Sequence, residues 1–155
     1  NSGMNFLDFD FKNQEPDSLP FVQKFNFSRQ LNSSEGYSYF ITNLFADFDK
    51  NPFLEDQRNT DIDFGTERHY TIYENFTIPE GFVFEELPKD VSMAMPDHLV
   101  DYSRMMATSD NTLNVTININ FNSPFYTVNS YADFREFYKK LLASLNEQVV
   151  IKKKS

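Results

Sequence analysis

The strictest alternation of apolar and polar residues lies between Thr112 and Asn122. Every odd-numbered position of this segment is apolar, from Leu113 to Phe121, and every even-numbered position is Thr or Asn. Successive side chains of a β-strand point to opposite faces, so a strand here would bury one face and leave the other to water. A helix would scatter the same residues around its axis. The pattern therefore predicts a β-strand with one face on a core.

Similar alternation recurs along most of the chain between turn-forming residues, which indicates an antiparallel sheet structure. The expected strands are residues 7–12, 21–31, 37–44, 69–78, 82–87, 91–95, 100–106, 112–122 and 149–151. Glycine-containing links predict two hairpins, one across Gly36 and one across Pro79–Gly81, each pairing the strands on either side. Glu74 is the one residue of an inward-facing set that does not suit an apolar face.

The period of the apolar pattern changes between Tyr131 and Leu145, where one stripe of an amphipathic α-helix is expected. Ser130 followed by Asp133 resembles a capping box with Asp in place of Glu. The elements together predict a mainly β fold. We expect an antiparallel β-sandwich, either immunoglobulin-like or a strongly curved sheet, with one C-terminal α-helix followed by a final strand. Residues 1–19 are expected to form an N-terminal strand or extension, and residues 20–154 the β-sandwich domain.

Composition excludes several classes of function. The 155-residue chain suits one domain, and its 18 Phe and eight Tyr, with no Trp, predict an aromatic core. A formal charge of −9 argues against nucleic acid and against anionic membrane surfaces as partners. No apolar run approaches the ~20 residues of a membrane-spanning helix, so no membrane insertion is expected. The absence of cysteine rules out disulfides, thiolate metal sites and thiol nucleophiles.

An Asp-rich segment opens at Asp47 like an EF-hand calcium loop, but Pro52 stands where Gly is required and Arg58 where Glu is required. The EF-hand interpretation therefore fails. A looser cation site within residues 47–63 and a solvated acidic loop both remain open. The candidate ligands of the looser site are Asp47, Asp49, Asp61 and Asp63.

The two histidines, His69 and His98, lack the ligand spacing of a zinc site. Asp101 and Ser103 lie near His98 in sequence, but nearness in sequence does not make a catalytic triad. We therefore assign no catalytic residue, no metal ligand and no cofactor, and expect no enzymatic activity.

Residues 21–154 resemble a family of bacterial domains in their turn and packing motifs. The motifs are Asn51-Pro52-Phe53 with Glu55 and Arg58, Asp63-Phe64-Gly65, Ile78-Pro79-Glu80-Gly81-Phe82, Leu87-Pro88-Lys89, Phe134, Phe137-Tyr138 and Gln148-Val149-Val150-Ile151-Lys152-Lys153. The chain resembles the C-terminal domain of unknown function that follows the transglutaminase-like core in Gram-negative cell-envelope proteins. This resemblance implies a β-sandwich accessory domain in the periplasm or at the cell surface. The implied partner is the upstream core of the same polypeptide, or another protein domain.

Pattern and resemblance together predict a non-catalytic accessory or interaction domain of a secreted or cell-envelope, protease-related protein. Any Cys-dependent chemistry of the core cannot reside here, because this chain has no cysteine. The segment 51–65 is the first candidate interface, because Phe53, Arg58 and Phe64 combine aromatic and charged groups on a loop. The other interpretation is that both rings fill the core of this domain. Tyr73 is out of phase with its apolar neighbours and should face solvent.

The sequence leaves open two alternative functions of different classes. The first is a carbohydrate-binding module that uses exposed tyrosines such as Tyr73. The second is an independent hydrolase in which two of the 23 acidic residues converge as paired carboxylates.

Overall fold

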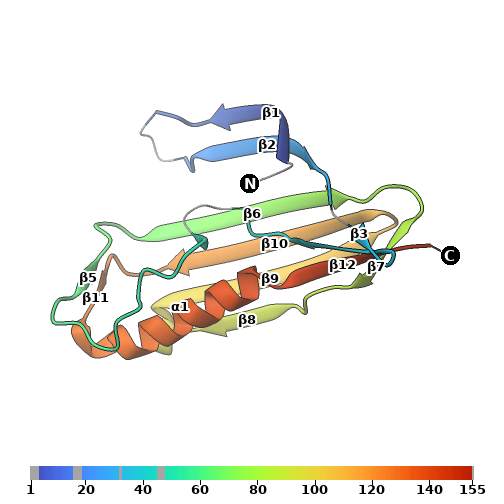
Figure 1. The fold of residues 1–155 in the computed structure, drawn as a ribbon. Helices are drawn as coiled ribbons and strands as arrows, with labels where there is room; N and C mark the ends of the chain where they lie inside the picture. The colour runs from blue at the N-terminus through green and yellow to red at the C-terminus, as the bar shows by residue number, and fades with distance from the viewer. Residues whose placement is uncertain (1–3, 16–18, 32, 45–47, 155) are drawn as a thin grey trace.

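Figure 1 shows the fold in a computed structural model, which describes residues 4–15, 19–31, 33–44 and 48–154. Two four-stranded antiparallel sheets form the body. The first, called the long sheet here, has the order β6 (Arg68–Thr77), β10 (Thr112–Phe121), β9 (Val100–Ser109), β8 (Val91–Ala94). The second, the short sheet, has the order β3 (Ser33–Ser34), β4 (Tyr37–Ile41), β12 (Gln148–Lys153), β7 (Phe82–Glu86).

The remaining elements lie around these two sheets. They are α1 (Tyr131–Leu145), the ribbon of β5 (Ile62–Asp63) and β11 (Phe125–Tyr126), the hairpin of β1 (Met4–Lys12) and β2 (Val22–Arg29), and 3-10 turns at Pro96–His98 and Val128–Ser130. In Figure 1, α1 and the short sheet lie on the same side of the long sheet. In the described part of the chain, no helix is long and apolar enough to cross a membrane.

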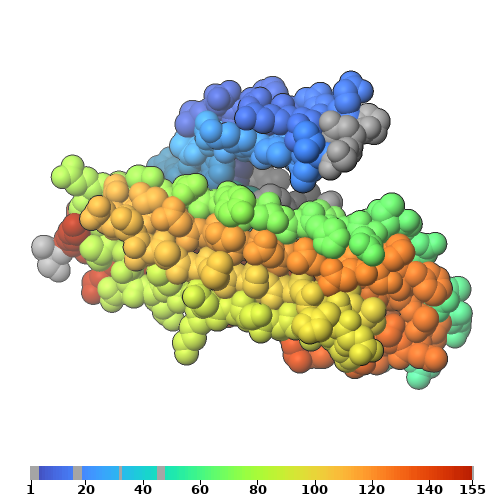
Figure 2. Space-filling view, turned by 180° about the vertical axis from the view of Figure 1, so that it is seen from behind, coloured from blue at the N-terminus to red at the C-terminus, as the bar shows by residue number. Residues whose placement is uncertain are grey.

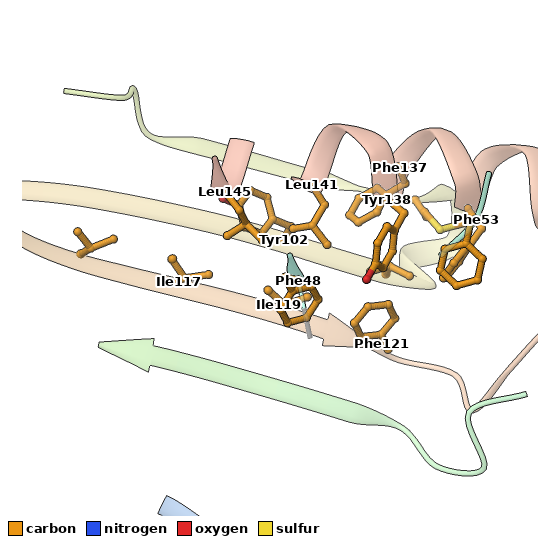
Figure 3. Close-up of a cluster of buried hydrophobic side chains, with 14 of the residues drawn as sticks. Phe48, Phe53, Tyr102, Ile117, Ile119, Phe121, Phe137, Tyr138, Leu141 and Leu145 are labelled. Atoms are coloured by element: carbon orange, nitrogen blue, oxygen red, sulfur yellow. The ribbon is translucent and has the colours of Figure 1, made fainter. Parts of the chain in front are cut away.

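Strand β10 lies at the centre of the long sheet, as its alternating sequence predicts. Its inward residues, Leu113 to Phe121 at every second position, are at most 4% exposed. Figure 3 shows Leu141 and Leu145 of α1 pointing toward Ile117 and Ile119. Each such buried side chain stabilises the fold by about 1.5–3 kcal/mol. The predicted mainly β class, antiparallel pairing, single C-terminal helix and final strand are confirmed.

The predicted hairpin across Gly36 is present, but it joins β3 to β4 and not residues 21–31 to β4, and the predicted hairpin across Pro79–Gly81 is wrong. β2 pairs with β1, whereas β4 pairs with β3 and β12. At Pro79–Gly81 the chain passes from the long sheet to the short sheet, so β6 pairs with β10 and β7 pairs with β12. A short turn can join two paired strands of one sheet or pass from one sheet to the other. Burial of the apolar faces decides which strands pair. The expected division after residue 19 remains a prediction, although the structure pairs one strand from each side of it.

The predicted capping box is also wrong. Ser130 Oγ donates to the carbonyl oxygen of Thr127 at 2.9 Å, and it makes no side-chain bond to a helix N–H. Ser130 already has helical backbone angles (φ −89°, ψ −1°) because a 3-10 turn precedes α1. An N-cap serine needs an extended backbone for its hydroxyl to reach the first free N–H groups.

Gly81 occupies the crossing between the sheets with a φ of +86°, and its carbonyl oxygen accepts a hydrogen bond from Lys154 N at 2.7 Å. A Cβ here would meet no atom within 4 Å, so the cost of Gly81→Ala is purely conformational. We expect it to lower the free energy of unfolding by about 1 kcal/mol in urea titrations. Gly81→Asn, which tolerates this backbone region better, should lose less. Equal losses in the two variants would contradict this explanation.

Candidate functional site

The two aromatic residues of the predicted interface loop lie in or against the core. Phe53 is 7% exposed, and its ring centre is 4.9 Å from that of Phe134 and 5.0 Å from that of Tyr138. Phe64 is half-buried and packs edge-on against Phe121, with ring centres 5.5 Å apart. The structure therefore favours the interpretation in which both rings fill the core.

Arg58 and Tyr73 lie on different parts of the surface. The Arg58 guanidinium lies 5.7 Å from the ring centre of Tyr131 at the start of α1, and its Nε donates to the Thr60 carbonyl oxygen at 3.3 Å. Tyr73 is 74% exposed on β6, in the orientation that its phase predicts. A binding role for Arg58 or Tyr73 remains a prediction.

The acidic side chains of the Asp-rich segment organise turns. Asp61 Oδ1 accepts a hydrogen bond from Val128 N at 2.6 Å, and Asp63 Oδ1 accepts one from Gly65 N at 2.8 Å. Asp47 lies outside the described residues. Within the described ranges, no three His, Cys, Asp or Glu side chains are grouped so that they could hold a metal ion.

The β1–β2 hairpin carries a cluster of phenylalanines that we call the aromatic face. Its members form two groups of ring contacts with centres 5.4–6.5 Å apart: Phe6 with Phe27, and Phe11 with Phe9, Phe21 and Phe25. Phe9 stands opposite Phe25 and Phe6 opposite Phe27 in the antiparallel register. The register shifts between Phe6 and Asp8, so a bulge returns Phe6 to the side of Phe9 despite their odd spacing.

Much of the aromatic face is open to solvent. Phe6 and Phe9 are 65% and 66% exposed, and Phe21 and Phe25 are 55% and 44% exposed. Figures 1 and 2 show the hairpin standing beside β6, apart from the body. Among the described residues, the one aromatic contact to the body joins Phe27 to Phe76, with ring centres 6.4 Å apart. Folding of this chain leaves that apolar surface in contact with water. Exposed apolar surface on this scale is typical of protein interaction sites.

The sequence does not predict this surface. The alternation in β1 and β2 predicts strands but does not distinguish an exposed apolar face from one that lies on a core. The bulge at Leu7 also takes Phe6 out of the period-two pattern. A usable signal is the density of phenylalanine on both sides of the turn that contains Pro16 and Pro20, but the pattern alone does not tell which surface these rings cover.

Glu74 is the one strongly perturbed carboxyl group among the described residues. It lies on the inward side of β6 opposite Val115, and neither carboxylate oxygen has a hydrogen-bond partner. Burial raises the pKa of Glu74 from 4.5 to about 8. β6 is an edge strand of the long sheet, and an inward-pointing ionisable group on an edge strand disfavours pairing with another sheet. Glu74 therefore lies on the edge strand of the long sheet beside which the β1–β2 hairpin stands.

Comparison with known proteins identifies the domain type. Residues 36–151 match a family described as a domain of unknown function with a solved structure, DUF3858. The fold is similar to that in the crystal structure of a protein described as "a putative protease" from Parabacteroides distasonis, with a TM-score of 0.63 and 16% identity. The similarity covers 77% of this chain and 24% of that one, so the aligned region is about a quarter of that protein. No curated protein matches the sequence.

Proposed function

The chain belongs to the DUF3858 family, and from this premise we propose that it is a non-catalytic accessory domain that docks through its aromatic face onto a neighbouring domain. The proposed partner is a transglutaminase-like core that precedes it in the same protease-related polypeptide, in the periplasm or at the cell surface. The observation that carries the proposal is the exposure of Phe6, Phe9, Phe21 and Phe25 on a hairpin beside the body.

Two further observations favour a neighbouring domain as the occupant. The family match begins at residue 36, so the whole hairpin lies outside the part of the chain that defines the family. The structurally similar protein is far longer than this chain, which is the arrangement expected when such a fold is appended to a larger body. A hairpin of two strands is marginally stable by itself, so a third layer against its apolar face would stabilise it.

The proposal is tested most cheaply by the gene from which the sequence comes. We expect the open reading frame to continue upstream of Asn1 into a domain that contains a cysteine. An initiation codon immediately upstream, with no preceding domain, would overturn the proposal. In the longer gene product, amide hydrogen exchange of β1 and β2 should be slower than in this chain, because docking would cover the hairpin.

The exposed aromatic face also predicts the behaviour of the isolated chain. Phe9→Ser combined with Phe25→Ser should lower the fluorescence of bound 1-anilinonaphthalene-8-sulfonate at least twofold, because both rings are open to the dye. The free energy of unfolding of the body should change by less than about 1 kcal/mol, since both sites are exposed. Tyr39→Ser, at a 51% exposed aromatic residue on β4, is the matched control and should leave the fluorescence nearly unchanged. Dye binding that is unaffected by the double substitution would show that the aromatic face is not accessible.

A further inference from the structure

The outer face of the long sheet contains a hollow of about 510 Å³ that none of the uses described so far involves. Figure 2 views this face, and no other layer covers it. The hollow extends over β8, β9 and β10, and we call it the polar trough. Its polar lining consists of Ser92, His98, Asp101, Ser103, Asn118 and Asn120.

Hydrogen bonds across the strands hold these side chains in place. The Thr71 hydroxyl donates to Asn118 Oδ1 at 3.2 Å, and Asn118 Nδ2 donates to Ser103 Oγ at 3.4 Å. Two residues further along β10, Asn120 Oδ1 lies 3.2 Å from His69 Nδ1. The amide and hydroxyl groups therefore form rows across the sheet with fixed orientations. Preorganisation of this kind lowers the entropy lost when a ligand binds.

The rim of the trough is formed by a strained turn. Asp97 and His98 both have left-handed backbones, with φ of 56° and 52°, which costs about 1–3 kcal/mol per residue. Asn122 Nδ2 holds the turn by donating to the His98 carbonyl oxygen at 2.7 Å and to Asp101 Oδ2 at 2.8 Å. His98 Nδ1 lies 2.7 Å from Asp101 Oδ1. The strain thus places an imidazole at the edge of the hollow, and strained residues of this kind concentrate at ligand sites.

The chemistry of the trough selects its ligand. The groups left for a ligand are mainly uncharged: the hydroxyls of Ser92 and Ser103, the amide N–H groups of Asn120 and the imidazole, with one carboxylate at Asp101. No Lys or Arg lines the trough and the chain carries a net charge of −9, so anions are disfavoured. Neighbouring sugar hydroxyls donate and accept hydrogen bonds in pairs, which suits planar amide and carboxylate side chains.

The width of the sheet and the exposed side chain of Tyr73 both suit the binding of a sugar chain. Four strands span roughly 14 Å, which accommodates a few sugar rings laid across the sheet. Tyr73 stands opposite Thr116 on the same face, two residues along β6 from Thr71, and its ring is 74% exposed. An exposed tyrosine can stack on the apolar face of a sugar ring. We propose that the polar trough binds a neutral oligosaccharide, with Ser103, Asn120 and Asp101 as the principal hydrogen-bonding residues and Asn118 holding the Ser103 hydroxyl in position.

The test is a titration of the full chain with neutral hexasaccharides of glucose, xylose, mannose and N-acetylglucosamine, followed by ¹H–¹⁵N NMR. With at least one series, we expect shifts confined to outer-face residues of β8, β9 and β10, and a dissociation constant of about 1 mM or lower. Asn118→Ala combined with Asn120→Ala should weaken binding at least tenfold. Ser103→Ala is a smaller change at the centre of the trough and should weaken oligosaccharide binding a few-fold. It keeps the test valid if the double variant does not fold.

Asn114→Ala is the matched control, because Asn114 is an exposed asparagine on the same face of β10 outside the trough. It should leave the affinity unchanged. The absence of NMR chemical-shift changes at trough residues with all four hexasaccharides would overturn the inference. So would shifts that map to the hairpin, or equal weakening by the Asn114 control. The result is independent of the aromatic face, so it can fail while the proposed docking role stands.

Discussion

Arg104→Met is expected to lower the free energy of unfolding by about 2–4 kcal/mol. Arg104 is 2% exposed, yet its guanidinium binds three groups from two separate segments of the chain. It donates to the carbonyl oxygen of Ser144 in the last turn of α1 and to that of Lys89 at 2.8 Å. It also pairs with the Glu147 carboxylate at 2.5 Å. Methionine fills the space of the aliphatic stem but leaves two carbonyl oxygens without their donor.

Chemical denaturation and hydrogen exchange together check this expectation. Arg135→Met is the matched control: Arg135 pairs with Asp56 at 2.7 Å, but the Asp56 side chain is 88% exposed, so the loss should stay below about 1 kcal/mol. The amides at the end of α1 should exchange faster in Arg104→Met than in the control. If both variants lose the same stability, the buried guanidinium does not join α1 to the long sheet.

Glu74 is expected to make the protein less stable as the pH rises from about 4.5 to about 8. Because burial raises the pKa of the folded carboxyl to about 8, the folded state keeps a proton that the unfolded state releases near 4.5. Between these two values the unfolded state binds fewer protons, so alkaline pH favours unfolding. Below pH 4.5 the group is protonated in both states and the effect vanishes. The total effect is on the order of 3 kcal/mol, with some solvent screening near the sheet edge.

Glu74→Met should remove this pH dependence and stabilise the domain most at pH 9, because an apolar side chain of similar length replaces a buried charge. The measurement is urea denaturation at pH 5, 7 and 9 for the wild type and the variant. Glu86→Met, at an exposed position on β7, is the matched control and should keep the wild-type slope. A Glu74→Met protein with the wild-type slope would mean that the carboxyl is hydrated in solution.

The same carboxyl bears on how the domain associates. β6 is an open edge, and a second sheet that paired with it would have to accommodate the inward side of the strand. A buried carboxyl group without a hydrogen-bond partner makes such pairing costly, and the cost rises as the group ionises near pH 8. Association should therefore proceed through the aromatic face rather than by edge-to-edge pairing of long sheets. Glu74→Met should accordingly increase self-association in sedimentation experiments at pH 8.

The candidate surfaces were less predictable than the fold. The sequence indicates that Tyr73 faces solvent, because the period of β6 assigns it to the outer face. It leaves open whether Phe53 and Phe64 lie inside or outside, because a loop has no period. The sequence does not predict the polar trough, for a different reason. His98, Asp101 and Asn120 meet through strand register and a left-handed turn, and neither follows from local spacing.

The sequence by itself determined the class of the fold. Local periodicity assigns Thr112–Asn122 to a half-buried strand and Tyr131–Leu145 to a helix, because side-chain direction follows from backbone geometry alone. Only the tertiary structure decided the partner of each strand: β2 with β1, and β7 with β12. Pairing depends on which apolar faces meet across long sequence separations, and a turn such as Pro79–Gly81 serves either route. For the same reason, only the tertiary structure leaves the phenylalanines of the hairpin exposed while it buries Arg104.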